Sequence, residues 1–207
     1  MGKLIYKVGD ATNPCVESGT RIIIHICNSI GSWGSGFVVA LSKKWKQPEM
    51  LYKQWFSQRA FLKGNDAFQL GNIQKVALDV DKYYAKTYVI NMIAQDGIMS
   101  NIRNDIPLRY DALEKCLQKV YDFCSEERKK GIPISVHCPR LGAGLAGGDW
   151  NKIEKLIEKW LVHGKDGFDT YVYDLSNEVG KWKGTVYDGQ EQLEVVDNEI
   201  KTEFFPT

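Results

Sequence analysis

The chain has 207 residues, of which 43% are hydrophobic and 12% aromatic, enough for one domain with a substantial core and too many for a disordered chain. Its formal net charge of +1 provides no general attraction to nucleic acid or to an acidic membrane. The charge is uneven, because residues 178–207 contain seven acids and three lysines and carry −4, which leaves +5 on residues 1–177. A mildly basic body is compatible with a small anionic ligand.

The five cysteines are odd in number and form no CxxC pair, a usage typical of reduced thiols in a cytoplasmic protein. The sequence contains neither a signal peptide nor a long apolar run of membrane-spanning length. We therefore expect a cytoplasmic protein that does not enter a membrane.

Apolar stretches separated by turn-forming residues predict strands that alternate with helices. Strands are expected at residues 3–8, 22–27, 68–80, 84–93, 132–138 and 169–175, and helices at residues 37–45, 48–61, 107–130 and from 149 onward. The run IIIHIC at residues 22–27 is mostly apolar and β-branched, as in a strand buried on both faces. The alternation predicts an α/β fold with an open sheet.

Two of these strands are each followed by a glycine-rich loop and then by a helix. The loops are NSIGSWGSG at residues 28–36 and PRLGAGLAGG at residues 139–148. Glycines at such junctions let an anion approach backbone N–H groups at the positive end of a helix. The first loop lacks the spacing of a Walker loop and of GxGxxG, so a purely structural turn is the alternative. In an open α/β sheet both loops lie at the carboxyl ends of strands, where a diphosphate would use both.

Three polar residues have both a functional and a structural interpretation. Asp10 follows the first strand and could accept a hydrogen bond from the exocyclic amine of a base, or form an Asx turn, which is favoured. Asp149 directly precedes a helix, where a carboxylate acts in catalysis or, as we favour, caps the first turn. Asn28 ends a strand beside the first glycine loop, which favours ligand binding over turn formation alone.

His25 lies inside the strand expected at residues 22–27. Histidine titrates near neutral pH and could activate a water molecule, and the equal alternative is a buried histidine bonded to a neighbour. His25, Cys27, His137 and Cys138 lack the spacing of a zinc site, so we expect no metal, and no cofactor is indicated.

Four motifs in order, GD at residues 9–10, HICN at 25–28, GSWGSG at 31–36 and PRLGAGLAGGDW at 139–150, together resemble the macrodomain family of ADP-ribose-binding modules. The resemblance covers roughly residues 3–175 and is nearest to the ADP-ribose 1″-phosphate phosphatases and the terminal ADP-ribose glycohydrolases. It implies a three-layer α/β/α fold with a mixed, mostly parallel sheet over residues 1–175. An acidic C-terminal extension follows at residues 176–207, in which Asp188-Gly189 predicts a hairpin and a lid is the alternative.

The resemblance also assigns roles to residues of this chain. Asp10 would accept the adenine amine, Asn28 would contact the distal ribose, and the two glycine loops would enclose the diphosphate. The ligand-binding residues that it implies are Gly9, Asp10, Ala11, Asn28, Ser32, Trp33, Gly34, Ser35, Gly36, Phe37, Gly142, Ala143, Gly144, Leu145 and Ala146.

The sequence departs from the pattern of the relatives whose chemistry uses a carboxylate or a lysine. Macrodomains that cleave ADP-ribosyl esters use an aspartate after the first glycine loop, and the matching position here is Val38. The lysine and aspartate of terminal glycohydrolases match Gln95 and Ala146, which supply neither a nucleophile nor a base. The candidates that remain for catalysis are His25, Asn28 and Asp149.

We therefore expect binding of ADP-ribose and hydrolysis of a bond at its distal 1″ position, either in ADP-ribose 1″-phosphate or in a mono-ADP-ribosylated substrate. The alternative is a non-catalytic reader of ADP-ribosylated protein or nucleic acid. A nucleic-acid binder that only shares the fold is disfavoured, because the net charge is near zero and no basic stripe with interleaved aromatic residues is present. The expected partner is ADP-ribose or an ADP-ribosylated substrate, with nucleic acid only as an ADP-ribosylated target, and the chain is expected to be a monomer.

Overall fold

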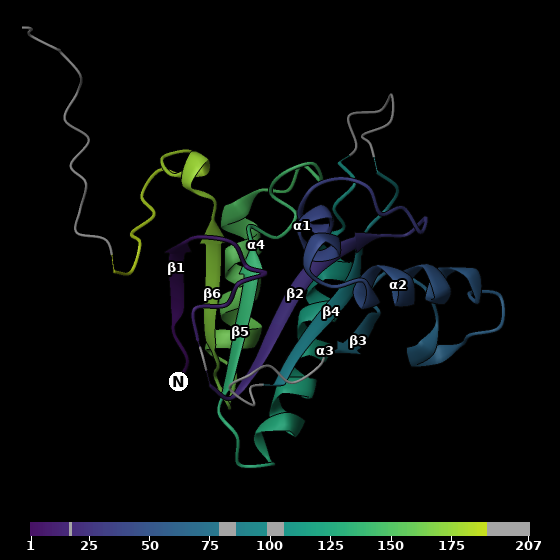
Figure 1. The fold of residues 1–207 in the computed structure, drawn as a ribbon, viewed down its shortest axis with the longest axis horizontal. Coiled ribbons are helices and arrows are strands. Elements are labelled where there is room, and N and C mark those ends of the chain that lie inside the picture. The colour runs from purple at the N-terminus through teal and green to yellow at the C-terminus, as the bar shows by residue number, and fades with distance from the viewer. Residues whose placement is uncertain (17, 79–85, 99–105, 190–207) are drawn as a thin grey trace, which may run out of the picture.

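A computed structural model describes residues 1–16, 18–78, 86–98 and 106–189. Its centre is a six-stranded sheet with helices on both faces (Figure 1). The strands are β1 (Leu4–Val8), β2 (Thr20–Asn28), β3 (Ile73–Ala77), β4 (Lys86–Gln95), β5 (Ile134–Pro139) and β6 (Asp169–Asp174), in the spatial order β1-β6-β5-β2-β4-β3. All neighbouring strands pair in parallel except β3 and β4, so the predicted mixed, mostly parallel sheet is confirmed.

Two pairs of helices form the outer layers of the molecule. The helices are α1 (Phe37–Lys44), α2 (Gln47–Ser57), α3 (Tyr110–Arg128) and α4 (Trp150–Ile157), and a π-helical turn at Glu158–Val162 continues α4. Ile22 and Ile24 of β2 pack in the core cluster that contains α3 and α4, whereas Ile23 packs with Leu41 of α1. Successive side chains of a strand point to opposite faces, so these contacts define a three-layer α/β/α arrangement.

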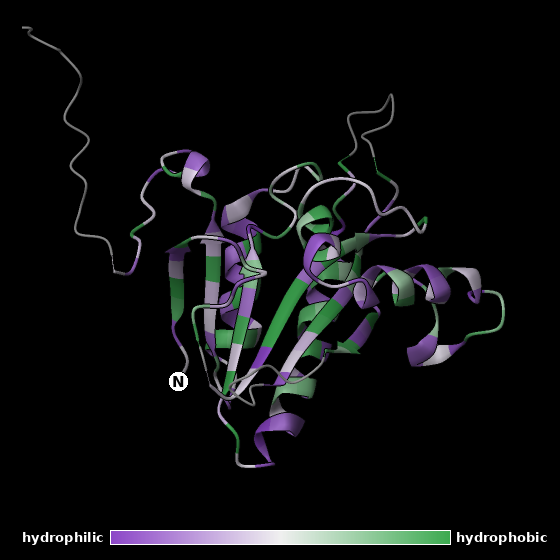
Figure 2. Cartoon of the chain, in the orientation of Figure 1, coloured by the Kyte–Doolittle hydropathy of each residue, from purple (hydrophilic) through white to green (hydrophobic). Residues whose placement is uncertain are grey.

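The sequence of β2 reflects its position at the centre of this arrangement. Ile22, Ile23 and Ile24 have no exposed surface, because helices cover both faces of the sheet. Figure 2 shows the same distribution, with hydrophobic residues along β2 and hydrophilic ones on the outer surface of the helices. The prediction of a strand buried on both faces is confirmed. None of the helices in the described ranges combines the length and the apolar character needed to cross a bilayer.

Several predicted elements are shorter in the structure than in the sequence analysis, and two of them have a clear structural reason. The helix expected at residues 48–61 ends at Ser57, and Phe61 is 85% exposed, so no burial would reward further helical turns there. The strand expected at residues 68–80 begins only at Ile73. Gly71 has a φ of 86°, and Asn72 donates its side-chain amide to the carbonyls of Gly64 and Ala67, which holds the chain in a turn.

The acidic extension is described as far as Gly189, and we call residues 175–189 the C-terminal segment. It contains a short 3-10 turn at Ser176–Glu178 and then reaches the edge of the sheet, where Tyr187 forms a parallel bridge with Tyr6 of β1. The backbone N–H of Asp188 donates to the carbonyl of Tyr6 at 2.9 Å. This part of the extension is therefore an addition to the sheet edge. The second arm of the predicted hairpin, residues 190–196, lies outside the described residues.

Two histidines are buried inside the strands. His25 in β2 is 1% exposed and His137 in β5 has no exposed surface. Burial lowers the pKa of His25 to about 4 and the pKa of His137 to about 3, because a low-dielectric interior disfavours the charged imidazolium. Both side chains are neutral at pH 7.

We expect the free energy of unfolding to decrease as the pH falls below about 6.5. The unfolded chain protonates both histidines near 6.5, whereas the folded chain does so only near 4 and 3, so protons favour the unfolded state across this window. Between pH 6.5 and pH 5, above the range where most carboxylates titrate, the decrease should be about 2–3 kcal/mol. Urea unfolding followed by tryptophan fluorescence at a series of pH values measures it. A constant free energy of unfolding over this window would contradict burial of the neutral histidines.

Candidate functional site

A cavity of about 990 Å³ lies along the carboxyl ends of the parallel strands. Its volume falls in the range of small-molecule and cofactor sites. The lining follows the order of the strands, with Gly9 and Asp10 after β1, Leu175 after β6, Arg140 after β5, Asn28 at the end of β2 and Gln95 at the end of β4. The cavity therefore crosses the sheet from its β1 edge to β4.

The structure brings most of the predicted site residues into this one cavity. Those that line it are Gly9, Asp10, Ala11, His25, Asn28, Ser32, Gly34, Ser35, Gly36, Phe37, Gly142, Gly144, Leu145 and Ala146. Trp33, Ala143 and Asp149 are not among the described residues that line it. Trp33 faces the interior, where its indole Nε1–H donates to Ser42 Oγ at 2.8 Å, and Ala143 packs against the larger core cluster.

Asn28 organises the first glycine loop with its side chain. Its Oδ1 accepts hydrogen bonds from the backbone N–H groups of Ile30 (3.1 Å) and Ser32 (3.0 Å), and its Nδ2 donates to the carbonyl of Ser32 at 2.7 Å. From α2, the buried Tyr52 hydroxyl donates to the Asn28 carbonyl at 2.6 Å. An amide nitrogen carries two hydrogens, so one remains beyond the bond to Ser32 and can be offered to a ligand.

The first loop ends at the N-terminus of α1. Gly36 occupies the N-cap position with a φ of 75°, and no side chain caps this helix end. The first-turn N–H groups of a helix have no intrahelical partner, and the macrodipole is positive there. A Cβ at Gly34 would meet no atom within 4 Å, so an anion can approach the backbone closely. This helix end is suited to a phosphate.

The second glycine loop faces the first one across the cavity. A Cβ at Gly36 would lie 3.9 Å from Leu145 Cδ1, so the Leu145 side chain reaches the first loop at this point. The second loop is held by a hydrogen bond from the N–H of Gly148 to the carbonyl of Gly142 at 2.8 Å. Gly142 has a φ of 64°, and a Cβ there would be 2.9 Å from Leu108, so the turn requires glycine.

His25 lies in the floor of the cavity and is hydrogen-bonded to the sheet. Its Nε2 is 2.6 Å from Asn91 Oδ1, and Asn91 donates its Nδ2 to Gln74 Oε1 and to the carbonyl of Pro48. Because Asn91 Oδ1 is then an acceptor, the imidazole carries its proton on Nε2 and leaves Nδ1 unprotonated. Trp33 contacts the ring edge-on, with 5.4 Å between ring centroids. His25 is thus the buried, bonded strand histidine of one interpretation, and it also lines the cavity.

The thiols and histidines do not gather into a metal site. Among the described residues, no three His, Cys, Asp or Glu side chains come together in a way that could hold an ion. Burial raises the pKa of the Cys27 and Cys138 thiols well above the usual range, so both are protonated at neutral pH. These cysteines fill the core as small apolar side chains.

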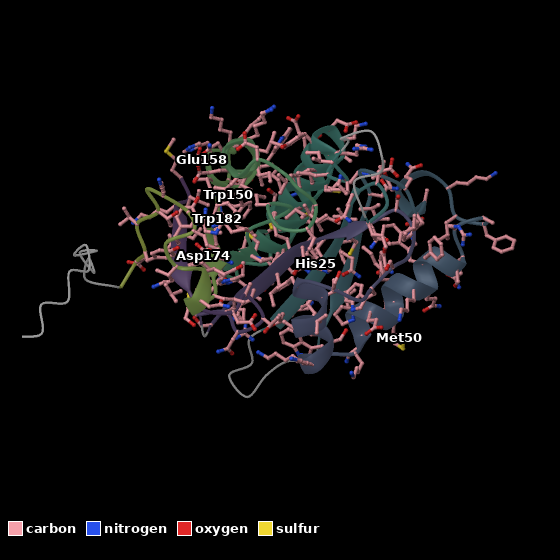
Figure 3. All side chains as sticks on the ribbon, turned by 90° about the horizontal axis from the view of Figure 1, so that it is seen from above. His25, Met50, Trp150, Glu158, Asp174 and Trp182 are labelled. Atoms are coloured by element: carbon pink, nitrogen blue, oxygen red, sulfur yellow. The ribbon has the colours of Figure 1, made fainter. Side chains whose placement is uncertain are left out.

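Several lining residues were absent from the predicted site. Among them are Arg140 at the start of the second glycine loop and three residues of the C-terminal segment, Leu175, Glu178 and Trp182. Figure 3 shows Trp182 and Trp150 beside Asp174 on one side of the molecule, with His25 further towards its centre. The sequence did contain one signal, since Trp182 is a large aromatic residue directly between two lysines in the acidic extension.

The fold and the cavity define an α/β/α protein with a ligand site at the carboxyl edge of its sheet, bounded by two glycine loops. No profile of a known protein family matches the chain. A solved structure of a macrodomain protein from Streptomyces coelicolor is 40% identical in sequence, with a TM-score of 0.65, and the match covers 83% of this chain and 99% of that one. The chain belongs to the macrodomain family.

Two curated proteins with similar sequences differ in how much of their length is matched. An ADP-ribose 1″-phosphate phosphatase from Meyerozyma guilliermondii is 28% identical over 173 residues, which cover 78% of this chain and 96% of that protein. A chromodomain-helicase-DNA-binding protein 1-like from Danio rerio is 29% identical over 161 residues, which cover 76% of this chain. This chain spans only 14% of the length of that helicase-like protein.

The position of Asp149 indicates that its carboxylate caps α4. The residue is exposed at the N-cap of α4, where its Oδ1 accepts a hydrogen bond from the N–H of Asn151 at 2.9 Å. We expect Asp149→Ala to lower the free energy of unfolding by about 1 kcal/mol and Asp149→Asn to leave it nearly unchanged, because asparagine is an equally good N-cap. Urea unfolding of the two variants measures the difference. Equal losses in both would show that the charge, not the cap, is what matters at this position.

Proposed function

We propose that the cavity binds ADP-ribose. The observation that supports this most directly is the order of groups along the cavity, from the Asp10 carboxylate through the two glycine loops to the Asn28 amide. A base, a diphosphate and a distal ribose present complementary groups in the same order. The names of the curated phosphatase relatives are consistent with this ligand.

Asp10 is suited to recognise the exocyclic amine of adenine. Its Oδ1 accepts a hydrogen bond from the N–H of Thr12 at 2.8 Å, which fixes the carboxylate in an Asx turn at the β1 end of the cavity. Among the described residues, no hydrogen bond occupies Oδ2, which can therefore accept from a ligand. The structural and the ligand-binding interpretations of Asp10 are thus compatible, because each uses a different oxygen.

The diphosphate would be held mainly by backbone dipoles. The uncapped N-terminus of α1 provides N–H groups on one side, and the loop that contains Gly142, Gly144 and Leu145 lies opposite. Arg140 is the cation that lines the cavity, but its guanidinium is already bonded to Asp174. Preoriented N–H groups stabilise an anion without having to reorganise when it binds.

We expect Asp10→Asn to weaken ADP-ribose binding about tenfold, because a hydrogen bond to a charged acceptor is lost and an amide replaces it. Isothermal titration calorimetry with ADP-ribose measures this. The matched control is Asp122→Asn, which changes an exposed carboxylate on α3 and should bind like the wild type. Equal affinity in Asp10→Asn and the wild type would exclude the proposed orientation of the base.

A second candidate function is hydrolysis of ADP-ribose 1″-phosphate, which His25 and the phosphatase relatives favour. In this reaction the oxygen of a water molecule bonds to phosphorus, the bond from phosphorus to the 1″ oxygen breaks, and the water proton is transferred to the leaving oxygen. The products are ADP-ribose and inorganic phosphate. His25 Nδ1 is unprotonated and could take the proton of the water, while Asn28 orients the ribose. Val38, Gln95 and Ala146 also line the cavity, and none of them is a base at neutral pH.

The lowered pKa of His25 gives this reaction a distinctive pH dependence. Because that pKa is about 4, the imidazole is already unprotonated at pH 5.5, so between pH 5.5 and pH 8 phosphate release should follow only the second ionisation of the substrate phosphate, which has a pKa of about 6. His25→Gln keeps a donor for Asn91 and should lower turnover by about a hundredfold or more while ADP-ribose still binds. Phosphate release from ADP-ribose 1″-phosphate under saturating substrate measures both effects.

Three outcomes separate the candidates. A titration near pH 6.5 in addition to that of the substrate phosphate would exclude the buried His25 as the base. Unchanged turnover in His25→Gln would do the same. Binding of ADP-ribose by the wild type without release of phosphate would favour a non-catalytic reader of ADP-ribosylated molecules.

A further inference from the structure

The C-terminal segment, residues 175–189, forms one wall of the cavity. Leu175, Glu178 and Trp182 all line it. Leu175 directly follows β6, and Asp10 follows the neighbouring strand β1, to which β6 is paired in parallel. The segment therefore stands at the end of the cavity where Asp10 lies, away from Asn28 and Gln95.

An arginine enclosed by aromatic rings anchors this wall. The Arg140 guanidinium lies 4.6 Å from the ring centroid of Tyr6, 4.7 Å from that of Trp150 and 4.8 Å from that of Trp182. Its side chain is only 6% exposed, so these cation–π contacts are largely shielded from water. Trp182 is thus fixed to a residue that begins the second glycine loop.

A buried ion pair extends the anchor to the rest of the segment. Arg140 donates from Nε and Nη2 to the two carboxylate oxygens of Asp174, at 2.8 and 2.6 Å, and Asp174 has no exposed surface. Two residues of the segment complete the network. Arg140 also donates to Thr185 Oγ1 at 2.9 Å. The Tyr187 hydroxyl donates to Asp174 Oδ2 at 2.8 Å. Both members of the ion pair are therefore bonded to the segment.

The indole ring of Trp182 acts through packing contacts. Its Nε1 is buried and has no hydrogen-bond partner within the described part of the chain. A buried donor without a partner is unfavourable, so its position must be favoured by the packing of the ring. The ring contacts Arg140 and Trp150 and also borders the cavity.

We propose that the C-terminal segment is the wall of the nucleobase end of the site, and that Trp182 is a residue that binds the base there. This inference rests on the proposed binding of ADP-ribose and adds a determinant outside the macrodomain motifs. The ring of Trp182, held by the Arg140 cage, covers an apolar part of the base whose amine faces Asp10. The distal ribose, at the other end, makes no contact with the segment.

The test compares two ligands that share adenosine diphosphate and differ at the distal ribose. We expect Trp182→Ala to weaken the binding of ADP-ribose and of ADP by the same factor, about tenfold, the size of effect seen when a base loses an aromatic neighbour. Trp182→Phe should stay within about threefold of the wild type, because it keeps an aromatic ring and loses no hydrogen bond. Tyr187→Phe, which removes the hydroxyl that is bonded to Asp174, should weaken the binding of both ligands about threefold. Calorimetric titration of each full-length variant measures these affinities.

Val186→Ala is the matched control, since Val186 lies in the same segment and is 74% exposed. It should bind both ligands like the wild type. Unchanged affinity in Trp182→Ala, or a loss for ADP-ribose without a loss for ADP, would overturn the assignment of this wall to the base. If Trp182→Ala unfolds, as judged by its circular dichroism, unchanged affinity in Tyr187→Phe would overturn the proposal in its place. A wild-type protein that binds neither ligand would overturn the proposed function itself and this inference with it.

Discussion

The parallel pairing of β1, β6, β5, β2 and β4 is the constraint on which the rest of the structure depends. Parallel strands all end at the same edge of a sheet, so the segments that follow five different strands meet there, although they lie far apart in the sequence. This pairing places β2 between helices on both faces of the sheet, which explains why Ile22, Ile23 and Ile24 follow one another in its middle without exposed surface. Two of its polar residues, His25 and Asn28, lie in its carboxyl half and line the cavity, whereas Thr20 and Arg21 lie at its amino end.

These few buried polar groups are satisfied by partners on α2 and β4. His25 bonds to Asn91, and Asn28 receives the hydroxyl of Tyr52, so the floor of the cavity is fixed before any ligand arrives. A buried polar group without a partner costs about 1–3 kcal/mol, and such networks therefore specify one arrangement of the side chains. The same network makes His25 a weaker general base. Its proton is committed to Asn91, and burial makes the free nitrogen a weak base.

The strands, the helices and both glycine loops could be predicted from the sequence because each depends on local patterns. Gly36 and Gly142 adopt positive φ, which favours glycine, so the glycines in the sequence indicate these turns. The run IIIHIC indicates a buried strand. The orientation of single side chains could not be derived in this way. Trp33 sits among ligand-binding candidates in the first loop, yet its ring packs inward against His25 and Tyr52. The sequence favours Asp149 as a helix cap over a catalytic carboxylate, but only the bond to Asn151 shows the orientation of its side chain.

The contact between Arg140 and the C-terminal segment shows why the remaining part of the site was missed. Its components come from β1, the second glycine loop, α4, β6 and the extension, and no sequence pattern links residues so distant from one another. A buried ion pair such as Arg140–Asp174 contributes little net stability, because desolvation offsets the attraction between the charges. The pair instead favours one arrangement of the two side chains, because any other arrangement would leave a buried charge without its partner. The second glycine loop and the C-terminal segment begin on either side of this pair, so the wall at the Asp10 end and the loop over the middle of the cavity share one rigid anchor.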